Sequence, residues 1–238
     1  MNIEKGLERG VLYIVATPIG NKYDMSSRAR EILIACNRVA AEDTRRAARL
    51  LAELGGNQHK LISLHEHNED KLVDYLVGEL VKGASVALVS DSGTPLLSDP
   101  GYRLVKAASS SGISVRPIPG PSSIIAALSV CPLPAHPFCF VGFLPKKKKE
   151  LHSRLQELIK KTEAVVFFES PRRIRRTLSL LSTLTDRKIF LIKEMTKTFE
   201  DSWSGSASEL LFQLEQDPKG EFVGVLEKVE LSENITLD

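Results

Sequence analysis

The sequence predicts an α/β protein with two α/β domains. Strand-like and helix-like runs alternate along the first half of the chain, a pattern typical of a parallel sheet covered by helices. Three prolines lie within residues 132–137, where they exclude a helix and stiffen an extended linker. We therefore expect one domain over residues 11–130 and a second over residues 138–229.

The elements of the first domain follow from the spacing of its apolar residues. Short apolar runs predict five strands, near Val11, Val39, Leu61, Val86 and Val115. Apolar residues that recur with the helical period predict five helices, over residues 27–36, 44–54, 70–82, 102–110 and 122–129. Strands that alternate with helices form βαβ units, so we expect a mainly parallel sheet.

The second domain contains both kinds of element as well. The same patterns predict strands over residues 138–141, 164–168, 189–192 and 222–226. They predict helices over residues 149–161, 174–184 and 206–215. These strands are better candidates for a mixed sheet than for a parallel one.

The composition indicates a globular chain. It has 238 residues, of which 42% are hydrophobic and 26% charged, enough for one large domain or two of ordinary size. Apolar runs fall short of the roughly 20 residues that a membrane-spanning helix needs. The first ten residues lack the apolar segment of a secretory signal, so we expect a cytoplasmic protein. The three cysteines have no close paired spacing, which disfavours a disulfide framework and a zinc site.

The most informative stretch is residues 86–101, where an apolar run breaks into a loop rich in Gly, Pro, Ser and Asp. The run suits a strand buried on both faces, and the small residues after it let backbone groups approach a ligand closely. Similar loops follow residues 11–16 and 114–118. Because the carboxyl ends of parallel strands share one sheet edge, we expect the three loops to converge on a single crevice. The alternative is that each loop is only a tight turn.

The loops do not have the pattern of a phosphate-binding cradle. The chain contains no G-x-x-x-x-G-K-[ST], and residues 17–21 hold one glycine where a dinucleotide fingerprint would have three. A nicotinamide-dependent reductase is therefore disfavoured. The loops instead offer backbone groups, hydroxyls and the carboxylates of Asp91 and Asp99, which suit a ligand with ammonium, amide or sugar hydroxyl groups.

Positive charge is concentrated in one part of the chain. Residues 143–193 hold 14 Lys or Arg against 5 Asp or Glu, a local balance of +9, whereas the rest of the chain has −7. This asymmetry indicates a surface for a polyanion. The alternative is a solvated helix face with ordinary solubilising charge.

Nine segments in order carry a family resemblance: ATPIGN (16–21), AEDTR (41–45), HEHNE (65–69), the loop 90–102, PIPGPS (117–122), GFLPK (142–146), ESP (169–171), KEMTK (193–197) and KGEF (219–222). Together they resemble the tetrapyrrole methylase superfamily, and more narrowly its branch of small-subunit ribosomal RNA cytidine 2'-O-methyltransferases. The resemblance implies two α/β domains of the tetrapyrrole methylase type with S-adenosylmethionine in the cleft between them. It also implies methylation of a cytidine ribose in 16S ribosomal RNA, within the small ribosomal subunit, by a homodimer without a metal.

The same resemblance assigns residues to the cofactor. In the first domain these are Pro18, Asp91, Gly93, Thr94, Ser122 and Ser123, and in the second Phe168 and Met195. The chain departs from the usual family pattern at three places: Lys22-Tyr23 replaces Leu-Gly, Arg172 replaces His, and Ser123 replaces Ala. The first two departures put details of substrate contact in doubt, but not the class of enzyme.

Methyl transfer to a ribose hydroxyl needs a group that removes its proton or a cation that stabilises the developing alkoxide. Glu169, Lys193 and Glu194 are the catalytic candidates because they end predicted strands of the second domain. Lys193 with Glu194 is equally consistent with a surface ion pair. For the RNA, the expected contacts are Arg45, Arg46, Lys146, Lys147, Lys148, Arg172 and Arg173. Arg45 and Arg46 also fit a simple capped helix with exposed arginines.

Histidines and aromatic residues give weaker signals. His65 and His67 have a spacing that places both on one face of a strand, but without further ligands nearby a metal site is disfavoured. Phe143, Phe167, Phe168 and Trp203 have rings that can stack on bases. Three of these four lie in or near apolar strand runs, so we expect them in the core.

Two other functions stay open. A methyltransferase that acts on carbon of a tetrapyrrole ring shares the implied fold. The basic segment argues against it, because a small carboxylated macrocycle needs fewer cations than an RNA backbone. The third possibility is a ribosome assembly factor that binds RNA without catalysis.

Overall fold

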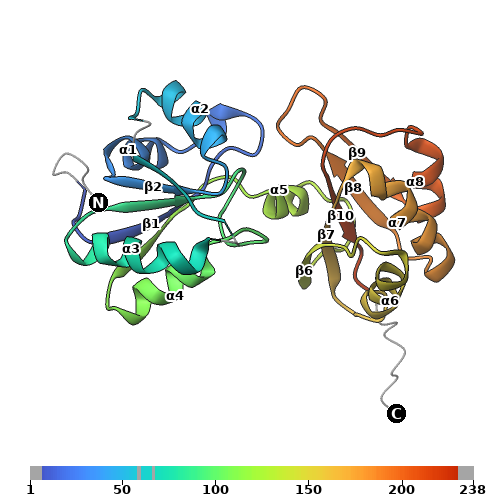
Figure 1. Cartoon of the computed structure of the whole chain (residues 1–238). Coiled ribbons are helices and arrows are strands. Elements are labelled where there is room, and N and C mark those ends of the chain that lie inside the picture. The colour runs from blue at the N-terminus through green and yellow to red at the C-terminus, as the bar shows by residue number, and fades with distance from the viewer. Residues whose placement is uncertain (1–6, 58–59, 66–67, 230–238) are drawn as a thin grey trace, which may run out of the picture. The chain divides into compact units, whose positions relative to one another are not determined.

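The computed structural model describes residues 7–57, 60–65 and 68–229. The chain forms two compact units, Met1–Ser122 and Ser123–Asp238 (Figure 1). The division falls before the proline-rich residues 132–137, so helix α5 (Ser123–Ser129) belongs to the second unit, where it packs against that unit's sheet. In the described ranges no helix is both long and apolar enough to cross a lipid bilayer.

The first unit contains a five-stranded sheet in the order β3-β2-β4-β1-β5, in which every neighbouring pair is parallel. Its strands are β1 (Val11–Val15), β2 (Arg38–Ala41), β3 (Leu61–Ser63), β4 (Val86–Val89) and β5 (Ser114–Ile118). All four residues of β4 are buried, as expected for a parallel strand covered on both faces. The predicted parallel sheet is confirmed.

Two helices cover each face of this sheet (Figure 1). They are α1 (Ser27–Ala35) and α2 (Thr44–Leu54) on one face, and α3 (Glu69–Val81) and α4 (Tyr102–Ser110) on the other. Asp43 caps the start of α2, where its carboxylate accepts the N–H of Arg45, and Gly55 caps the end in the left-handed conformation. A short 3-10 helix, η2 (Lys22–Asp24), follows the β1 loop.

The second unit contains a mixed sheet in the order β6-β7-β10-β8-β9, as predicted. Its strands are β6 (Phe138–Phe143), β7 (Ala164–Glu169), β8 (Ile189–Lys193), β9 (Asp201–Gly205) and β10 (Phe222–Leu226). Only β6 and β7 pair in parallel, and β10 runs antiparallel to both of its neighbours. Strand β9 was missed in the sequence because Asp-Ser-Trp-Ser-Gly is polar and lies at the sheet edge.

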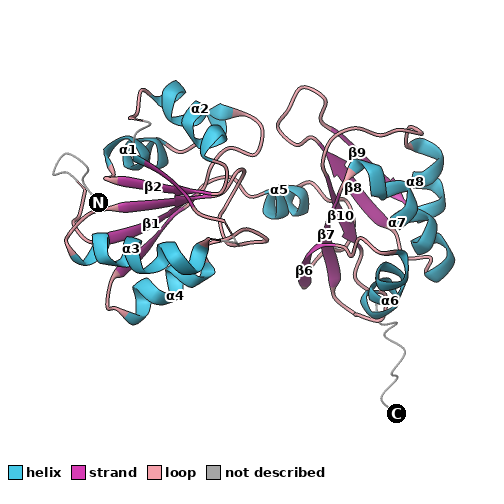
Figure 2. Ribbon diagram, viewed as in Figure 1, coloured by secondary structure: helices cyan, strands magenta, loops and turns pink. Residues whose placement is uncertain are grey.

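Three helices pack on one face of the mixed sheet, as Figure 2 shows, and form the core of this unit. They are α6 (Lys148–Leu158), α7 (Pro171–Leu184) and α8 (Ala207–Gln213).

Helix α7 begins earlier than residue 174, the start that the sequence predicts. Pro171 lies in its first turn, where a proline loses no hydrogen bond and its fixed φ favours the helix. The helix therefore starts directly after the strand residue Glu169 and Ser170.

Candidate functional site

The loops after β1 and β4 are joined at the carboxyl edge of the parallel sheet. The N–H of Thr17 donates to the carbonyl of Gly93 at 2.9 Å, and the N–H of Gly93 donates back at 3.1 Å. The Thr17 hydroxyl is buried and donates to the carbonyl of Ser90 at 3.3 Å. These three bonds fix the two loops against each other.

The loop after β5 completes this edge. The hydroxyl of Thr94 donates to the carbonyl of Pro121 at 3.0 Å, which joins the β4 and β5 loops. A Cβ at Gly120 would lie 3.0 Å from the Cβ of Ala16, so the β1 and β5 loops pack too closely for a larger residue there. The predicted convergence of the three loops is therefore confirmed within the first unit.

The predicted cofactor residues fall into two groups. The first unit brings Pro18, Asp91, Gly93, Thr94 and Ser122 together on the three joined loops. The second unit carries Ser123 at the start of α5, Phe168 near the end of β7, and Met195 just after β8. Met195 is buried and Phe168 is half-buried.

Carboxylates line the joined loops of the first unit. One carboxylate oxygen of Asp91 accepts the N–H of Asp43 at 3.0 Å, and the other lies 3.5 Å from Nε of Arg46. Burial, with the charges of Glu42 and Asp91 nearby, raises the pKa of Asp99 to about 6, although a hydrogen bond from Ser90 acts in the opposite direction. Glu42 was not among the predicted site residues, although its position directly after β2 is a signal that could have predicted it.

The Asp99→Asn variant is expected to melt at a higher temperature than the wild type above about pH 6. The folded state keeps Asp99 protonated up to a pKa of about 6, whereas the unfolded chain releases the proton near the ordinary value of 3.8. Between these values the folded state holds more protons, so the contribution of this group to stability falls as pH rises. Melting temperatures of both proteins between about pH 4 and about pH 8 check this expectation. A difference that does not change with pH would contradict it.

The three catalytic candidates lie at the ends of β7 and β8 in the second unit. Glu169 is fully buried: one carboxylate oxygen lies 2.6 Å from Arg173 and accepts the Ser170 N–H, and the other accepts the hydroxyl of Thr177 at 2.8 Å. Its carboxylate is thus held by an ion pair and two hydrogen bonds in the interior. Such an arrangement fixes the start of α7 more directly than it offers a base to a substrate.

Glu194 follows β8 in a strained conformation. Its φ is 50°, and that of Thr196 is 64°, both in the left-handed region that non-glycine residues rarely adopt. Its carboxylate accepts from Nζ of Lys197 at 2.9 Å and from the N–H of Glu221 at 3.2 Å. Desolvation raises the pKa of Glu194, but these hydrogen bonds and the charges of Lys197 and Lys193 outweigh it and lower the pKa below its ordinary value.

Lys193 is the remaining candidate. Its Nζ lies 5.2 Å from the ring centroid of Trp203, a cation–π contact that directs the side chain along the β8–β9 surface. In the described part of the chain, its ammonium has no carboxylate within 4.0 Å. Trp203 was missed as a partner because its strand was not predicted.

The basic segment divides into exposed and structural residues. Lys146, Lys147, Lys148 and Arg172 are exposed, as an RNA contact requires. The side chain of Arg173 is only 16% exposed and binds Glu169, Ser170 and the carbonyl of Leu144. Two further arginines of the segment bind backbone carbonyls: Arg175 those of 211, 214 and 215, and Arg187 those of 159, 161, 163 and 227.

Arg45 and Arg46 lie exposed on the first turn of α2. Arg45 forms an ion pair of 2.7 Å with Asp43, and this hydrogen-bonded contact holds the pKa of Asp43 below its usual range. Both the capped helix and the exposed arginines that the sequence predicts are therefore present.

His65 follows β3, whereas Glu66 and His67 lie outside the described residues. Among the residues that the structure describes, no cluster of His, Cys, Asp or Glu has the arrangement of a metal site.

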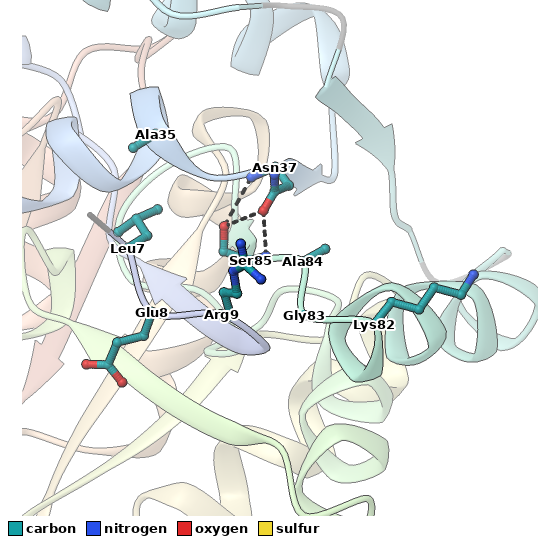
Figure 3. Close-up of a pocket in the computed structure, with 9 residues that line it drawn as sticks. All are labelled: Leu7, Glu8, Arg9, Ala35, Asn37, Lys82, Gly83, Ala84 and Ser85. Carbon is teal, nitrogen blue, oxygen red and sulfur yellow. Dashed lines mark hydrogen bonds between the residues drawn. The ribbon is translucent and has the colours of Figure 1, made fainter. Parts of the chain in front are cut away.

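A pocket in the first unit lies at the other edge of the parallel sheet (Figure 3). Asn37 and Ser85, which precede β2 and β4, are hydrogen-bonded to each other in its wall. Because the strands are parallel, this amino-terminal edge lies opposite the joined loops. Ligands of such sheets bind at the carboxyl edge, so this pocket is not our candidate site.

Solved structures of other proteins share the fold of this chain. A uroporphyrin-III C-methyltransferase from Thermus thermophilus has a TM-score of 0.60 at 20% identity, with 92% of this chain and 95% of that chain covered. Diphthine synthase has a TM-score of 0.69 at 14% identity, and the match covers 93% of this chain and 91% of that protein. At these identities the likeness concerns the fold alone.

Sequence comparison identifies the family. The family described as tetrapyrrole (corrin/porphyrin) methylases matches residues 11–211. The chain belongs to this family. It is 45% identical to the ribosomal RNA small subunit methyltransferase I of Xylella fastidiosa (strain Temecula1) over 92% of this chain and 81% of the relative. It is 42% identical to the protein of that name from Escherichia coli O157:H7, over 92% of this chain and 78% of that relative.

Proposed function

We propose that this chain transfers a methyl group from S-adenosylmethionine to the 2'-hydroxyl of a cytidine ribose in small-subunit (16S) ribosomal RNA. The observation that carries the proposal is 40–46% identity to relatives named ribosomal RNA small subunit methyltransferase I, over 89–94% of this chain. The family match over residues 11–211 includes the first sheet and strands β6, β7, β8 and β9 of the second. The enzyme acts in the cytoplasm as a homodimer, and its substrate is RNA within the small ribosomal subunit.

The residues at the joined loops fit the cofactor. S-adenosylmethionine supplies an electrophilic methyl group on a sulfonium, and it also carries an ammonium group and ribose hydroxyls. The carboxylates of Asp91, Asp99 and Glu42 create negative potential at this edge, and after burial, the charges of Glu42 and Asp91 contribute to the raised pKa of Asp99. A cation relieves such repulsion. We assign the cofactor to Pro18, Asp91, Gly93, Thr94, Ser122, Ser123, Phe168 and Met195.

The catalytic candidates divide into two roles. The ammonium of Lys193 stabilises the charge that develops on the ribose oxygen, because its positive charge has no carboxylate partner within 4.0 Å among the described residues. Glu194 stays ionised because its pKa is lowered, and it accepts the proton that leaves the ribose hydroxyl. Glu169 acts as a positioning residue through Arg173 and the carbonyl of Leu144.

The RNA backbone is assigned to the exposed cations. These are Arg45, Arg46, Lys146, Lys147, Lys148 and Arg172. Arg173 contributes indirectly, because it holds the loop that carries the lysines. Neutralised phosphates release counterions, so binding weakens as salt rises.

Methyl incorporation tests the proposed function. Small ribosomal subunits from cells that lack this enzyme are incubated with it and with S-adenosylmethionine labelled in the methyl group. We expect label in the RNA, and 2'-O-methylcytidine in its nuclease digest. A parallel incubation offers a tetrapyrrole in place of the subunits; label there and none in the RNA would support the carbon methyltransferase, and RNA binding without label would support the assembly factor. Either outcome would overturn the proposal.

The Asp91→Asn variant is expected to bind S-adenosylmethionine about tenfold to about 100-fold more weakly, because a hydrogen bond to a charged group contributes about 1.5–3 kcal/mol. The amide oxygen still accepts the N–H of Asp43, so the loop stays in place. Calorimetric titration measures the affinity. Asp74→Asn, an exposed carboxylate on α3, is the matched control. Equal affinities of Asp91→Asn and the wild type would remove Asp91 from the site.

A further inference from the structure

Phe143 is an exposed aromatic residue at the end of β6. The residue is 57% exposed, although the sequence predicts that it lies in the core. Phe167, by contrast, is 3% exposed and belongs to the helix-covered core. Residues alternate along a strand, so Phe168 faces the other side of the sheet. There its ring meets Phe143 edge-on, with centroids 5.3 Å apart, and Phe140 at 4.9 Å.

The chain after Phe143 is held firmly. Leu144 is buried, and its N–H donates to the carbonyl of Phe168 at 3.4 Å. Its own carbonyl accepts from Arg173 at 3.0 Å, and the carbonyl of Lys146 accepts from Arg176 at 2.8 Å. Arg173 is in turn fixed by the buried Glu169. A ring on such a support loses little conformational freedom when a ligand covers it.

Positive charge follows this ring closely along the chain. Residues 146–149 are four consecutive lysines, and all are exposed. Lys147 forms an ion pair with Glu150, and for the other three no ion pair occurs within the described ranges. Arg172, on the first turn of α7, is also exposed. The surface made by Phe143, residues 146–149 and Arg172 therefore combines an aromatic face with five cations.

We propose that Phe143 stacks on a base of the RNA substrate while the neighbouring lysines bind its phosphates. This inference rests on the proposed function and names how that substrate is held. Aromatic faces flanked by cations are the usual means of holding single-stranded nucleic acid. A protein partner fits less well, because lysine is depleted where protein interfaces bury aromatic residues. The stacked base lies beside Phe168, which we assign to the cofactor.

Binding of small ribosomal subunits from cells that lack the enzyme tests the inference. Phe143→Ala and Phe143→Leu are expected to weaken binding about 5- to 150-fold, the range found for loss of one stacked base. Phe143→Trp retains a flat ring and is expected to bind like the wild type. Phe212→Ala, which removes a 92% exposed phenylalanine from α8, is the matched control and should bind unchanged.

Salt dependence separates stacking from charge. The slope of log affinity against log salt is expected to stay unchanged in Phe143→Leu and to become shallower in Lys148→Ala, because only the latter alters phosphate neutralisation. Calorimetry with S-adenosylmethionine should give wild-type affinity for Phe143→Leu.

Three results would overturn the inference: wild-type RNA affinity in Phe143→Leu, a loss of cofactor affinity in that variant, or a change in its oligomeric state. A loss of cofactor affinity would mean that the ring contacts the cofactor. A change in oligomeric state would mean that it contacts another copy of the chain. Methylation by the wild type is measured separately, so the proposed function stands or falls independently.

Discussion

The Lys193→Met variant is expected to transfer methyl groups about 100- to 1000-fold more slowly than the wild type, with unchanged affinity for S-adenosylmethionine. Methionine keeps an unbranched side chain over Trp203 but removes the charge that we assign to the developing alkoxide. Loss of one such stabilising donor lowers the rate of a reaction by about this factor. Single-turnover measurements at saturating RNA and cofactor isolate the chemical step from binding.

Lys188→Met is the matched control, because Lys188 precedes β8 and Lys193 ends the same strand. It should leave the single-turnover rate unchanged. Lys193→Arg keeps the charge and is expected to recover part of the lost rate. If Lys193→Met instead raises KM for RNA with kcat unchanged, Lys193 binds substrate and is not catalytic.

The Glu169→Ala variant is expected to lower the free energy of unfolding of the second unit by about 3–5 kcal/mol. Removal of one partner leaves the guanidinium of Arg173, 16% exposed, without its carboxylate, and losses of this size are typical of broken buried ion pairs. Thr177 also loses its acceptor. Trp203 is the single tryptophan of the sequence, so its fluorescence during urea unfolding reports on this unit.

Glu157→Ala provides the comparison, since Glu157 forms an exposed ion pair with Arg154 in the same unit. An exposed pair contributes at most about 1 kcal/mol, so this variant should unfold at nearly the wild-type urea concentration. Glu169→Gln retains hydrogen-bonding atoms and should fall between the two. Similar midpoints for Glu169→Ala and Glu157→Ala would show that the buried pair does not stabilise the unit.

Much of the fold follows from the apolar pattern alone. The run at β4 is continuous because both faces of a parallel strand are covered, and the order of strands and helices then predicts the converging loops. Strand β9 was not predictable in this way. Its Ser and Asp residues face solvent at the sheet edge, and pairing with β8 forms the strand where local propensity does not.

The candidate site was less predictable than the fold. The charge count of residues 143–193 does not distinguish Lys148, which is exposed, from Arg175 or Arg187, which bind backbone carbonyls. The ion pair of Glu169 with Arg173 places two predicted site residues in the interior, and only their positions in space reveal this. Phe143 likewise has the sequence surroundings of a core residue but an exposed ring.

The position of β10 bears on how the chain folds during translation. This strand is among the last described residues, yet it forms the middle of its sheet, between β7 and β8. A nascent chain that ends before residue 222 has two separate strand pairs with open edges and no central strand to join them. The first unit has all its strands by residue 118 and can fold while the ribosome still makes the second. The sheet that carries Lys193 is therefore completed only after residues 222–226 have been made and have left the ribosome.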